Sequence, residues 1–286
     1  MDPRKFLNSL FEIAVAKAQP RQCVPPFLSK LDFAERTVVF GAGKASAAMA
    51  QVVEQHTSAD LEGLVITRYG HAVECQQIKI VEAGHPVPDQ QGMRAAASML
   101  EISSGLTEKD SVLCLISGGG SSLLSLPAPG LSLEDKQRVT SKLLKCGATI
   151  HEINCIRKHL SAIKGGRLAV ACSPAPLLTL AISDVPRDDL SVIASGPTVA
   201  DPSTFEDAIK ILTKYDISLE PHSAVEVETS DLAFSTEAIE VIAVEDFEVP
   251  ETTLLGLEDY LLDSSISKDI NTDLKTPNTP FLSRIP

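Results

Sequence analysis

The chain has 286 residues, of which 44% are hydrophobic and 22% charged, and its formal net charge is −13. This composition is typical of a globular protein with one large or two ordinary domains and excludes an intrinsically disordered chain. The acidic balance argues against a nucleic-acid partner, because phosphates need a basic surface. No apolar run approaches the roughly 18 residues that a membrane span needs, which argues against a membrane partner.

The first twenty residues predict an amphipathic helix rather than a signal peptide. Apolar side chains such as Phe6, Leu10 and Phe11 recur at helical spacing, and Glu12 and Lys17 interrupt them. Six cysteines are scattered along the chain without a C-x-x-C pair, so we expect reduced, mostly buried thiols. We therefore expect a cytoplasmic protein.

From residue 36 onward, short apolar stretches alternate with longer helical ones. Thr149 and Glu152 have the spacing of a capping box, and Ser132 is the expected N-cap of the preceding helix. This alternation predicts an α/β fold with βαβ crossovers and a mostly parallel sheet, whose ligands bind at the carboxyl ends of the strands. Strands are expected at 36–43, 63–67, 78–84, 111–117 and 176–185, and helices at 44–55, 89–103, 132–147, 149–163 and 203–216.

The C-terminal segment differs in composition from the rest of the chain. Residues 221–286 contain 14 acidic and 3 basic residues, and Gly256 is their single glycine. The segment 236–249 alternates like a strand, 250–263 has the pattern of an amphipathic helix, and 264–286 has the composition of a disordered segment. We therefore expect an α/β domain over 1–217 and a divergent, partly disordered acidic tail over 218–286.

The first informative loop is "GAGKAS", which contains Gly41, Gly43 and Lys44. A Walker P-loop would need glycine in place of Val38, and the dinucleotide fingerprint G-x-G-x-x-G meets Ser46 at its third glycine. What remains is a glycine turn at a helix N-terminus, where backbone N–H groups and the Lys44 ammonium favour an anion. A structural turn with a solvated lysine stays open as the alternative.

The second loop follows the strand 111–117 in the stretch "LISGGGSSLLSLP". A hydrolase nucleophile elbow needs G-x-S-x-G, which this stretch does not contain. Three consecutive glycines let the backbone approach a ligand closely and aim several N–H groups at it. The candidate phosphate-binding residues are Ser117, Gly118, Gly119, Gly120 and Ser121.

The third loop, "ISDVPRDDLSVIASGPT", places Asp184 at the end of a strand. A carboxylate there could hold Mg²⁺ or accept the proton of a substrate hydroxyl. An aspartate at a strand end is equally often a simple turn residue, and this alternative stays open. Asp184 is therefore a candidate catalytic residue and a candidate Mg²⁺ ligand.

A fourth segment, "HEINCIRKHLSAIKGGRLA", carries several cations. Helical spacing places four polar residues on one side, a set suited to a carboxylate or phosphate, and Lys164 and Gly165 follow directly. A solvated helix face is the alternative interpretation. The four residues are Asn154, Arg157, Lys158 and Ser161.

Taken together, these segments closely resemble the glycerate kinase family whose full-length members end in a MOFRL domain. The resemblance rests on "FGAGKASAAMA", "GHPVPDQQG", "LISGGGSSLL", "GATIHEINCIRKHLSAIKGGRLA" and "ISDVPRDDLSVIASGPTVADPSTF", in consistent order across about residues 5–217. It implies a Rossmann-like three-layer sandwich and a kinase that phosphorylates D-glycerate from ATP with Mg²⁺, usually giving 2-phosphoglycerate. It further implies that Lys44 is an active-site residue and that 117–121 cradles phosphate or substrate.

The sequence departs from the family's pattern after about Ile217. Family members continue with a second domain that contains G-G-R-N-Q-E and G-T-D-G motifs, and neither string occurs here. We therefore expect one wall of the cleft to be missing and phosphoryl transfer to be impaired, because transfer depends on positioning and charge stabilisation. Two other interpretations stay open: a non-catalytic glycerate- or nucleotide-binding protein with an acidic interaction tail, and a sugar-phosphate-binding, isomerase-like domain.

Overall fold

The structure is a computed structural model that describes residues 2–28, 33–34, 36–218 and 239–242. Lys17–Val244 forms one compact unit, and helix α1 (Pro3–Lys17) lies almost wholly outside it, so α1 is described by itself. Its bounds confirm the helix expected at the N-terminus. Among the described helices, none combines the length and the apolar character that a membrane crossing requires.

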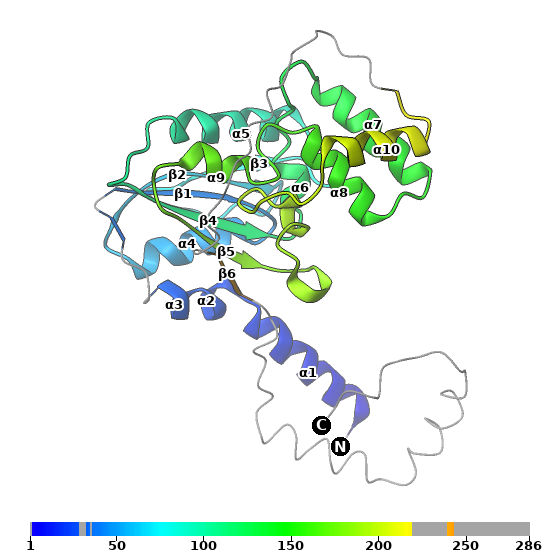
Figure 1. Ribbon diagram of the computed structural model, residues 1–286. Coiled ribbons are helices and arrows are strands. Elements are labelled where there is room, and N and C mark those ends of the chain that lie inside the picture. Colours follow the sequence, from blue (N-terminus) through cyan, green and yellow to red (C-terminus); the bar gives the residue numbers. More distant parts are fainter. Residues whose placement is uncertain (1, 29–32, 35, 219–238, 243–286) are drawn as a thin grey trace. The chain divides into compact units, whose positions relative to one another are not determined.

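Six strands form one sheet in the order β3-β2-β1-β4-β5-β6, and every neighbouring pair is parallel (Figure 1). Successive strands run outward in one direction from β1 to β3 and in the other from β4 to β6. The direction reverses between β1 and β4, which is the point where ligands bind in doubly wound sheets. The strands are β1 (Arg36–Ala42), β2 (Asp60–Arg68), β3 (Lys79–Ala83), β4 (Ser111–Ser117), β5 (Leu177–Ile182) and β6 (Ile239–Ile242).

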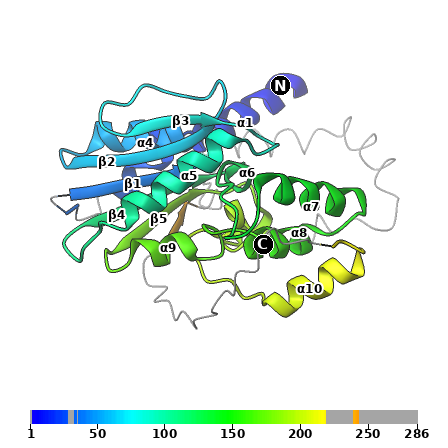
Figure 2. The ribbon, with the colours of Figure 1, turned by 90° about the horizontal axis from the view of Figure 1, so that it is seen from above.

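Helices cover both faces of the sheet, which confirms the expected three-layer α/β sandwich. Helices α2, α3 and α4 lie on one face and α5 and α9 on the other, while α7, α8 and α10 form a group beside the short helix α6 (Figures 1 and 2). The helices are α2 (Pro20–Cys23), α3 (Pro25–Leu28), α4 (Ser46–His56), α5 (Gln90–Ser103), α6 (Gly120–Leu123), α7 (Leu133–Lys145), α8 (Ile150–His159), α9 (Arg167–Cys172) and α10 (Phe205–Lys214), with 3₁₀ turns η1 (Pro186–Asp188) and η2 (Ile193–Ser195).

The alternation of side chains along each strand divides the interior into two cores. In β1, Val38 and Phe40 pack on the side of α5 and α9, whereas Val39 packs on the side of α4. Successive side chains of a strand point to opposite faces, so a continuous apolar strand fills both layers. A third core lies within the α7–α8–α10 group and includes Leu143 and Ile156.

Some helices end earlier than expected, because turns replace their last residues. The helix expected at 149–163 ends at His159, because Leu160 leaves helical geometry and Ser161 forms an isolated antiparallel bridge with Pro127. The capping box of Thr149 and Glu152 is present, as is the N-cap hydroxyl of Ser132. Strand β6 falls within the strand expected at 236–249 and pairs with β5. The expected helix at 250–263 and disordered segment at 264–286 lie outside the described residues.

Candidate functional site

The loops that follow β1 and β4 are bonded to each other at the reversal point of the sheet. The Ser117 hydroxyl accepts the Ala45 N–H at 3.0 Å and lies 3.0 Å from the Ser46 hydroxyl. Gly43 has a φ of 151°, and a Cβ there would overlap the Ser117 hydroxyl oxygen. Glycine is therefore required at 43, and buried Ser117 fastens the two loops together.

The β1–α4 loop differs from the expected anion cradle because its backbone is engaged within the fold. The N–H groups of Gly43, Lys44, Ala45 and Ser46 donate to Ile66 O, Gly118 O, Ser117 Oγ and Gly43 O, respectively. Gly41 is a strand residue packed against the backbone of β4 rather than a loop residue. The group that this loop offers to a ligand is the exposed side chain of Lys44.

The β4–α6 loop has the free backbone donors that the first loop lacks. Within the described part of the chain, the N–H groups of Gly119, Gly120 and Ser121 donate no hydrogen bond. Gly119 has a φ of 90°, the left-handed conformation that glycine adopts easily, and α6 begins at the next residue. Successive free N–H groups form a concave donor surface of the kind that binds anions.

Side chains from three other loops surround these glycines. A Cβ at Gly118 would overlap the carboxylate of Asp184. A Cβ at Gly119 would lie 2.9 Å from Nε2 of His85 and 3.4 Å from Cγ of Lys44. Lys44, His85 and Asp184 follow β1, β3 and β5, so the parallel sheet brings them to one edge.

Charge at this edge is predominantly positive around His85. Partial burial and the neighbouring cations Lys44 and Arg68 lower the pKa of His85, and the Asp184 carboxylate opposes this shift. Desolvation and nearby positive charges both disfavour imidazolium. His85 is therefore mainly neutral near pH 7 and is able to accept a proton.

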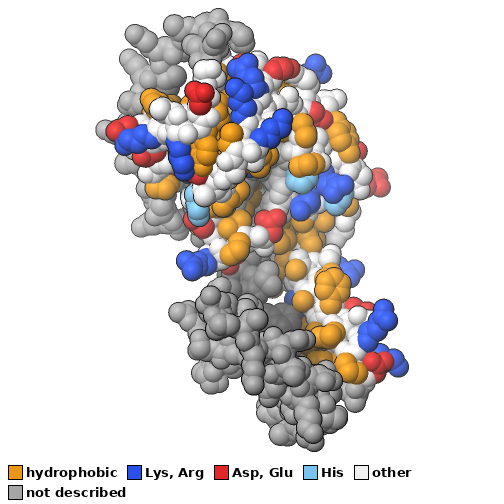
Figure 3. Space-filling model, turned by 90° about the vertical axis from the view of Figure 1, so that its right-hand side faces the viewer, with side chains coloured by type: hydrophobic (Ala, Val, Ile, Leu, Met, Phe, Trp, Pro, Cys, Tyr) orange, Lys and Arg blue, Asp and Glu red, His pale blue; other side chains and the backbone are white. Residues whose placement is uncertain are grey.

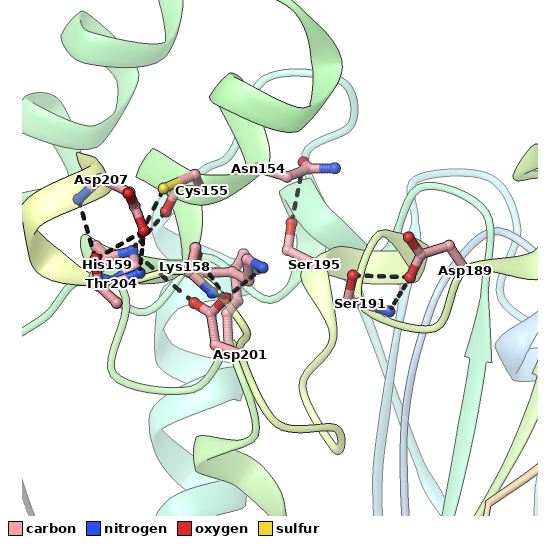
Figure 4. A network of polar contacts seen from close by, with 12 residues as sticks. Asn154, Cys155, Lys158, His159, Asp189, Ser191, Ser195, Asp201, Thr204 and Asp207 are labelled. Carbon is pink, nitrogen blue, oxygen red and sulfur yellow. Dashed lines mark hydrogen bonds and ion pairs between the residues drawn. The ribbon is translucent and has the colours of Figure 1, made fainter. Parts of the chain in front are cut away.

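A buried polar chain supports the glycine loop from the side of α8. The Ser195 hydroxyl lies 2.7 Å from that of Ser121. It donates to Asn154 Oδ1 at 3.4 Å (Figure 4). Ser195 and Ala194 have φ values of 61° and 52°, and a Cβ at Gly120 would lie 2.8 Å from the Ala194 methyl. Non-glycine residues in this region store strain, which often marks functional turns. Asn154 thus supports the loop through Ser195.

The cations expected on one ligand-binding side of α8 meet different surroundings. Lys158 is buried and pairs with Asp201 at 2.6 Å, so its charge is neutralised within the fold (Figure 4). Lys164 is buried and donates to the carbonyl of Leu124, and Gly165 turns the chain there with a φ of 60°. Arg157 is partly exposed and enters none of the ion pairs among the described residues.

Surface charge does not single out a site on the face in Figure 3. Basic and acidic side chains are interspersed there among hydrophobic ones. Surface charge on this face therefore gives no evidence for the position of a ligand site.

Sequence reasoning missed His85 and Ser195. His85 lies in "GHPVPDQQG" directly after an expected strand, so the carboxyl-end rule could have identified it. Ser195 carried no comparable signal, because its surroundings depend on the packing of distant segments.

The donor set around Asp184 fits Mg²⁺ carried by a nucleotide rather than a dedicated metal cage. Among the described residues, no group of three or more His, Cys, Asp or Glu side chains is arranged to hold a metal ion. Mg²⁺ in phosphoryl-transfer sites is typically held by one or two carboxylates together with phosphates and water. The exposed carboxylate of Asp184 beside the glycine loop meets that requirement.

The strand order and these loops define a doubly wound α/β protein whose reversal point presents an anion-binding loop with a lysine, a histidine and an aspartate. A family model described as "Domain of unknown function (DUF4147)" matches residues 6–228, and the chain belongs to this family.

Relatives of the chain include proteins named as glycerate kinases, which confirms the resemblance. A D-glycerate 2-kinase of Thermotoga maritima is 44% identical over 221 residues, covering 76% of this chain and 53% of the relative. A putative hydroxypyruvate reductase of Agrobacterium vitis is 54% identical over 222 residues, covering 77% and 50%. A crystal structure of glycerate kinase from Thermotoga maritima superimposes with a TM-score of 0.72 and 39% identity, covering 84% of this chain and 59% of that one. The chain thus spans about half the length of the curated relatives it matches.

Proposed function

We propose that this chain is a glycerate kinase-type phosphotransferase that binds ATP and D-glycerate and forms phosphoglycerate, with 2-phosphoglycerate the favoured product. The observation that carries the proposal is the gathering of Lys44, His85 and Asp184 around the free N–H groups of the β4–α6 loop. Relatives named as glycerate kinases support the choice of substrate. A cytoplasmic location stays a prediction.

Each group has a role that phosphoryl transfer requires. The N–H groups of Gly119, Gly120 and Ser121 and the Lys44 ammonium hold the transferred phosphoryl group, where negative charge must be stabilised. The substrate hydroxyl attacks the γ-phosphorus, its bond to ADP breaks, and the hydroxyl proton passes to Asp184 or to neutral His85. The Asp184 carboxylate would hold the Mg²⁺ of the nucleotide, and the ion would supply positive charge to the phosphate oxygens. Ser117 and Lys158 are outside this set, because their polar atoms are used within the fold.

The test is ATP-dependent phosphorylation of D-glycerate by the purified chain, followed by phosphorus NMR, which distinguishes the two phosphoglycerates. Lys44→Ala is expected to abolish transfer without unfolding the protein, because the Lys44 side chain is exposed. Lys142→Ala, an exposed lysine on α7, is the matched control and should keep wild-type activity. Equal rates for wild type and Lys44→Ala would remove the proposal.

The two roles of Asp184 are separable by experiment. If Asp184 holds Mg²⁺, Asp184→Asn raises the Mg²⁺ concentration needed for half-maximal activity. If it accepts the proton, the same substitution lowers kcat at saturating Mg²⁺ and alters the pH profile.

Hydroxypyruvate reduction is the second candidate, favoured by the name of the relative from Agrobacterium vitis. It requires a dinucleotide whose pyrophosphate lies on the first βα loop of the sheet. Against it, the N–H groups from Gly43 to Ser46 already have acceptors, and Ser46 stands where the third glycine would be. Oxidation of NADH or NADPH by hydroxypyruvate in the presence of the chain would favour the reductase.

Binding without turnover is the remaining interpretation from the sequence. Calorimetric titration with D-glycerate and ATP separates it from catalysis, because it predicts saturable binding and no product. A phosphosugar that displaces glycerate would instead favour the isomerase-like interpretation.

A further inference from the structure

Three cations converge on the segment that follows α6. The Lys164 ammonium donates to the carbonyl of Leu124, and the Lys136 ammonium donates to the carbonyl of Leu126 at 3.0 Å. The two acceptors are two residues apart, so the ammonium groups lie close together. Both lysines are buried, with 1% and 7% of their surface exposed.

Arg157 of α8 lies near both buried lysines, since its positive charge lowers the pKa of each. Asn154, three residues earlier on α8, shares its side of the helix and accepts from Ser195 beneath the glycine loop. Just beyond the end of α8, the Ser161 hydroxyl donates to the Leu126 carbonyl at 3.1 Å. Arg157 itself is partly exposed.

None of the ion pairs found among the described residues involves Lys136, Arg157 or Lys164. Burial, together with the charge of Arg157, lowers the pKa of Lys136 to about 7, and burial lowers the pKa of Lys164 well below its usual range. Buried charges are costly unless they are paired.

The fold does not need Lys136 to satisfy its acceptor. The Leu126 carbonyl also accepts the Ala162 N–H at 3.2 Å and the Ser161 hydroxyl. A carbonyl oxygen has two lone pairs, so these two donors fill it. Each ammonium has three N–H donors, of which one is used here, and Arg157 has five. The cluster thus has unused donors in one place, beside the positive charge of Arg157, and a bound anion would favour the protonated form of both lysines.

We propose that Lys136, Arg157 and Lys164 form a second anion site, which binds the oxyanion of a small molecule, either a carboxylate or a phosphate. If the proposed kinase function holds, on which this assignment of the ligand rests, the occupant is the carboxylate of D-glycerate. The phosphoryl group then lies at the other end of α6, beside Lys44. A helix of four residues spans about 6 Å, so one small substrate can reach between the two ends.

The test measures thermal unfolding of the full chain with inorganic phosphate or D-glycerate, at constant ionic strength set with chloride. At least one of the two anions should raise the melting temperature of the wild type. The anion that raises it shows whether the site binds a phosphate or a carboxylate. Lys136→Met should leave the anion-free melting temperature unchanged or higher, because it removes an uncompensated buried charge. It should also weaken anion binding by about tenfold or more, as expected for the loss of a charge-assisted hydrogen bond.

Two further variants make the result specific. Arg157→Gln should lose the anion effect in the same way, and Lys142→Met, an exposed lysine on the same helix as Lys136, should keep it. An unchanged anion effect in Lys136→Met and Arg157→Gln would overturn the site. So would a wild type that neither anion stabilises, or a Lys136→Met variant destabilised equally with and without anion.

Failure of this site and failure of the proposed function are distinguishable. Binding here needs neither ATP nor turnover, so a chain that binds D-glycerate through Lys136 but forms no product loses only the kinase function. Glycerate binding that depends on Lys44 and not on Lys136 keeps the kinase site and removes this one.

Discussion

Arg157 and Lys158 are neighbours on α8 and meet opposite surroundings. Lys158 points toward Asp201, which also lies near His159 and Arg167, so this side of the helix is compensated (Figure 4). Arg157 lies near Lys136 and Lys164 and enters none of the ion pairs found among the described residues. A positive charge alone therefore does not show what a side chain does. Lys158, which is paired with a carboxylate, stabilises the fold, whereas a cation without such a partner is available to a ligand.

Lys136→Met is expected to change how stability depends on pH. The pKa of Lys136 falls from 10.5 to about 7 in the folded chain, so between these values the unfolded chain binds a proton that the folded chain lacks. The wild-type free energy of unfolding therefore decreases as the pH falls from about 10 to about 7, and the full penalty is present below pH 7. Methionine removes this contribution, so the variant's advantage should be largest at and below pH 7.

Urea unfolding in phosphate-free buffers at about pH 7 and about pH 10 checks this prediction. Arg157 and Lys164 remain in both chains, but the charge of Lys136 helps to lower the pKa of Lys164, so methionine raises that pKa and adds to the variant's advantage at low pH in the same direction. Lys142→Met should differ from wild type by the same small amount at both pH values. A difference for Lys136→Met that is constant with pH would contradict the prediction.

At the scale of elements, contacts with three neighbouring segments fix the β4–α6 loop, while its own N–H donors stay free. The β1–α4 loop binds its start through Ser117, η2 packs under Gly120, and Lys164 holds its exit at Leu124. A preorganised donor surface of this kind stabilises developing charge without rearranging during the reaction.

Gly119→Ala is expected to disturb this loop and His85 together. Alanine at a φ of 90° is strained by about 1–2 kcal/mol, and its methyl group would lie 2.9 Å from the His85 ring. The variant should lose stability by at least that amount, show a shifted His85 imidazole resonance in NMR, and bind phosphate more weakly. Gly105→Ala, whose added methyl would meet nothing closer than 3.8 Å, is the control and should be neutral or slightly stabilising. An unshifted His85 resonance in a folded Gly119→Ala variant would show that the ring does not lie against this loop.

The sequence predicts the sheet well because its strands are apolar on both faces and its loops carry glycine. The same patterns predict the capping box at Thr149 and place Lys44 and Asp184 at strand ends. They could not show that Gly118 touches Asp184, or that the Ala45 N–H is already bonded, since both depend on which loops become neighbours. Lys136 and Lys158 look equally solvated in the sequence, and tertiary packing alone distinguishes them.

At the scale of the whole unit from Lys17 to Val244, two cores flank the sheet and a smaller third one lies within the α7–α8–α10 group. The proposed anion site joins this group to the sheet, because Lys136 and Arg157 come from α7 and α8 while Leu126 follows the glycine loop. A ligand there would connect two parts of the molecule that have separate cores.

The six free cysteines allow this connection to be measured. Cys155 lies in the α7–α8–α10 core and Cys114 belongs to strand β4 and packs in the core beside α5 and α9, whereas Cys146 is exposed at the end of α7. Burial raises the pKa of the Cys155 and Cys114 thiols, so a thiol reagent reaches them only when their surroundings open. The smaller core should open first, and in mild denaturant Cys155 should react before Cys114, with Cys146 reacting at once as the control for the reagent.

Inorganic phosphate or D-glycerate, whichever binds, should slow Cys155 and leave Cys146 unaffected, and this slowing should disappear in Lys136→Met. Simultaneous reaction of Cys155 and Cys114 under all conditions would mean that the group and the sheet unfold as one unit, and the ligand would then protect both thiols equally.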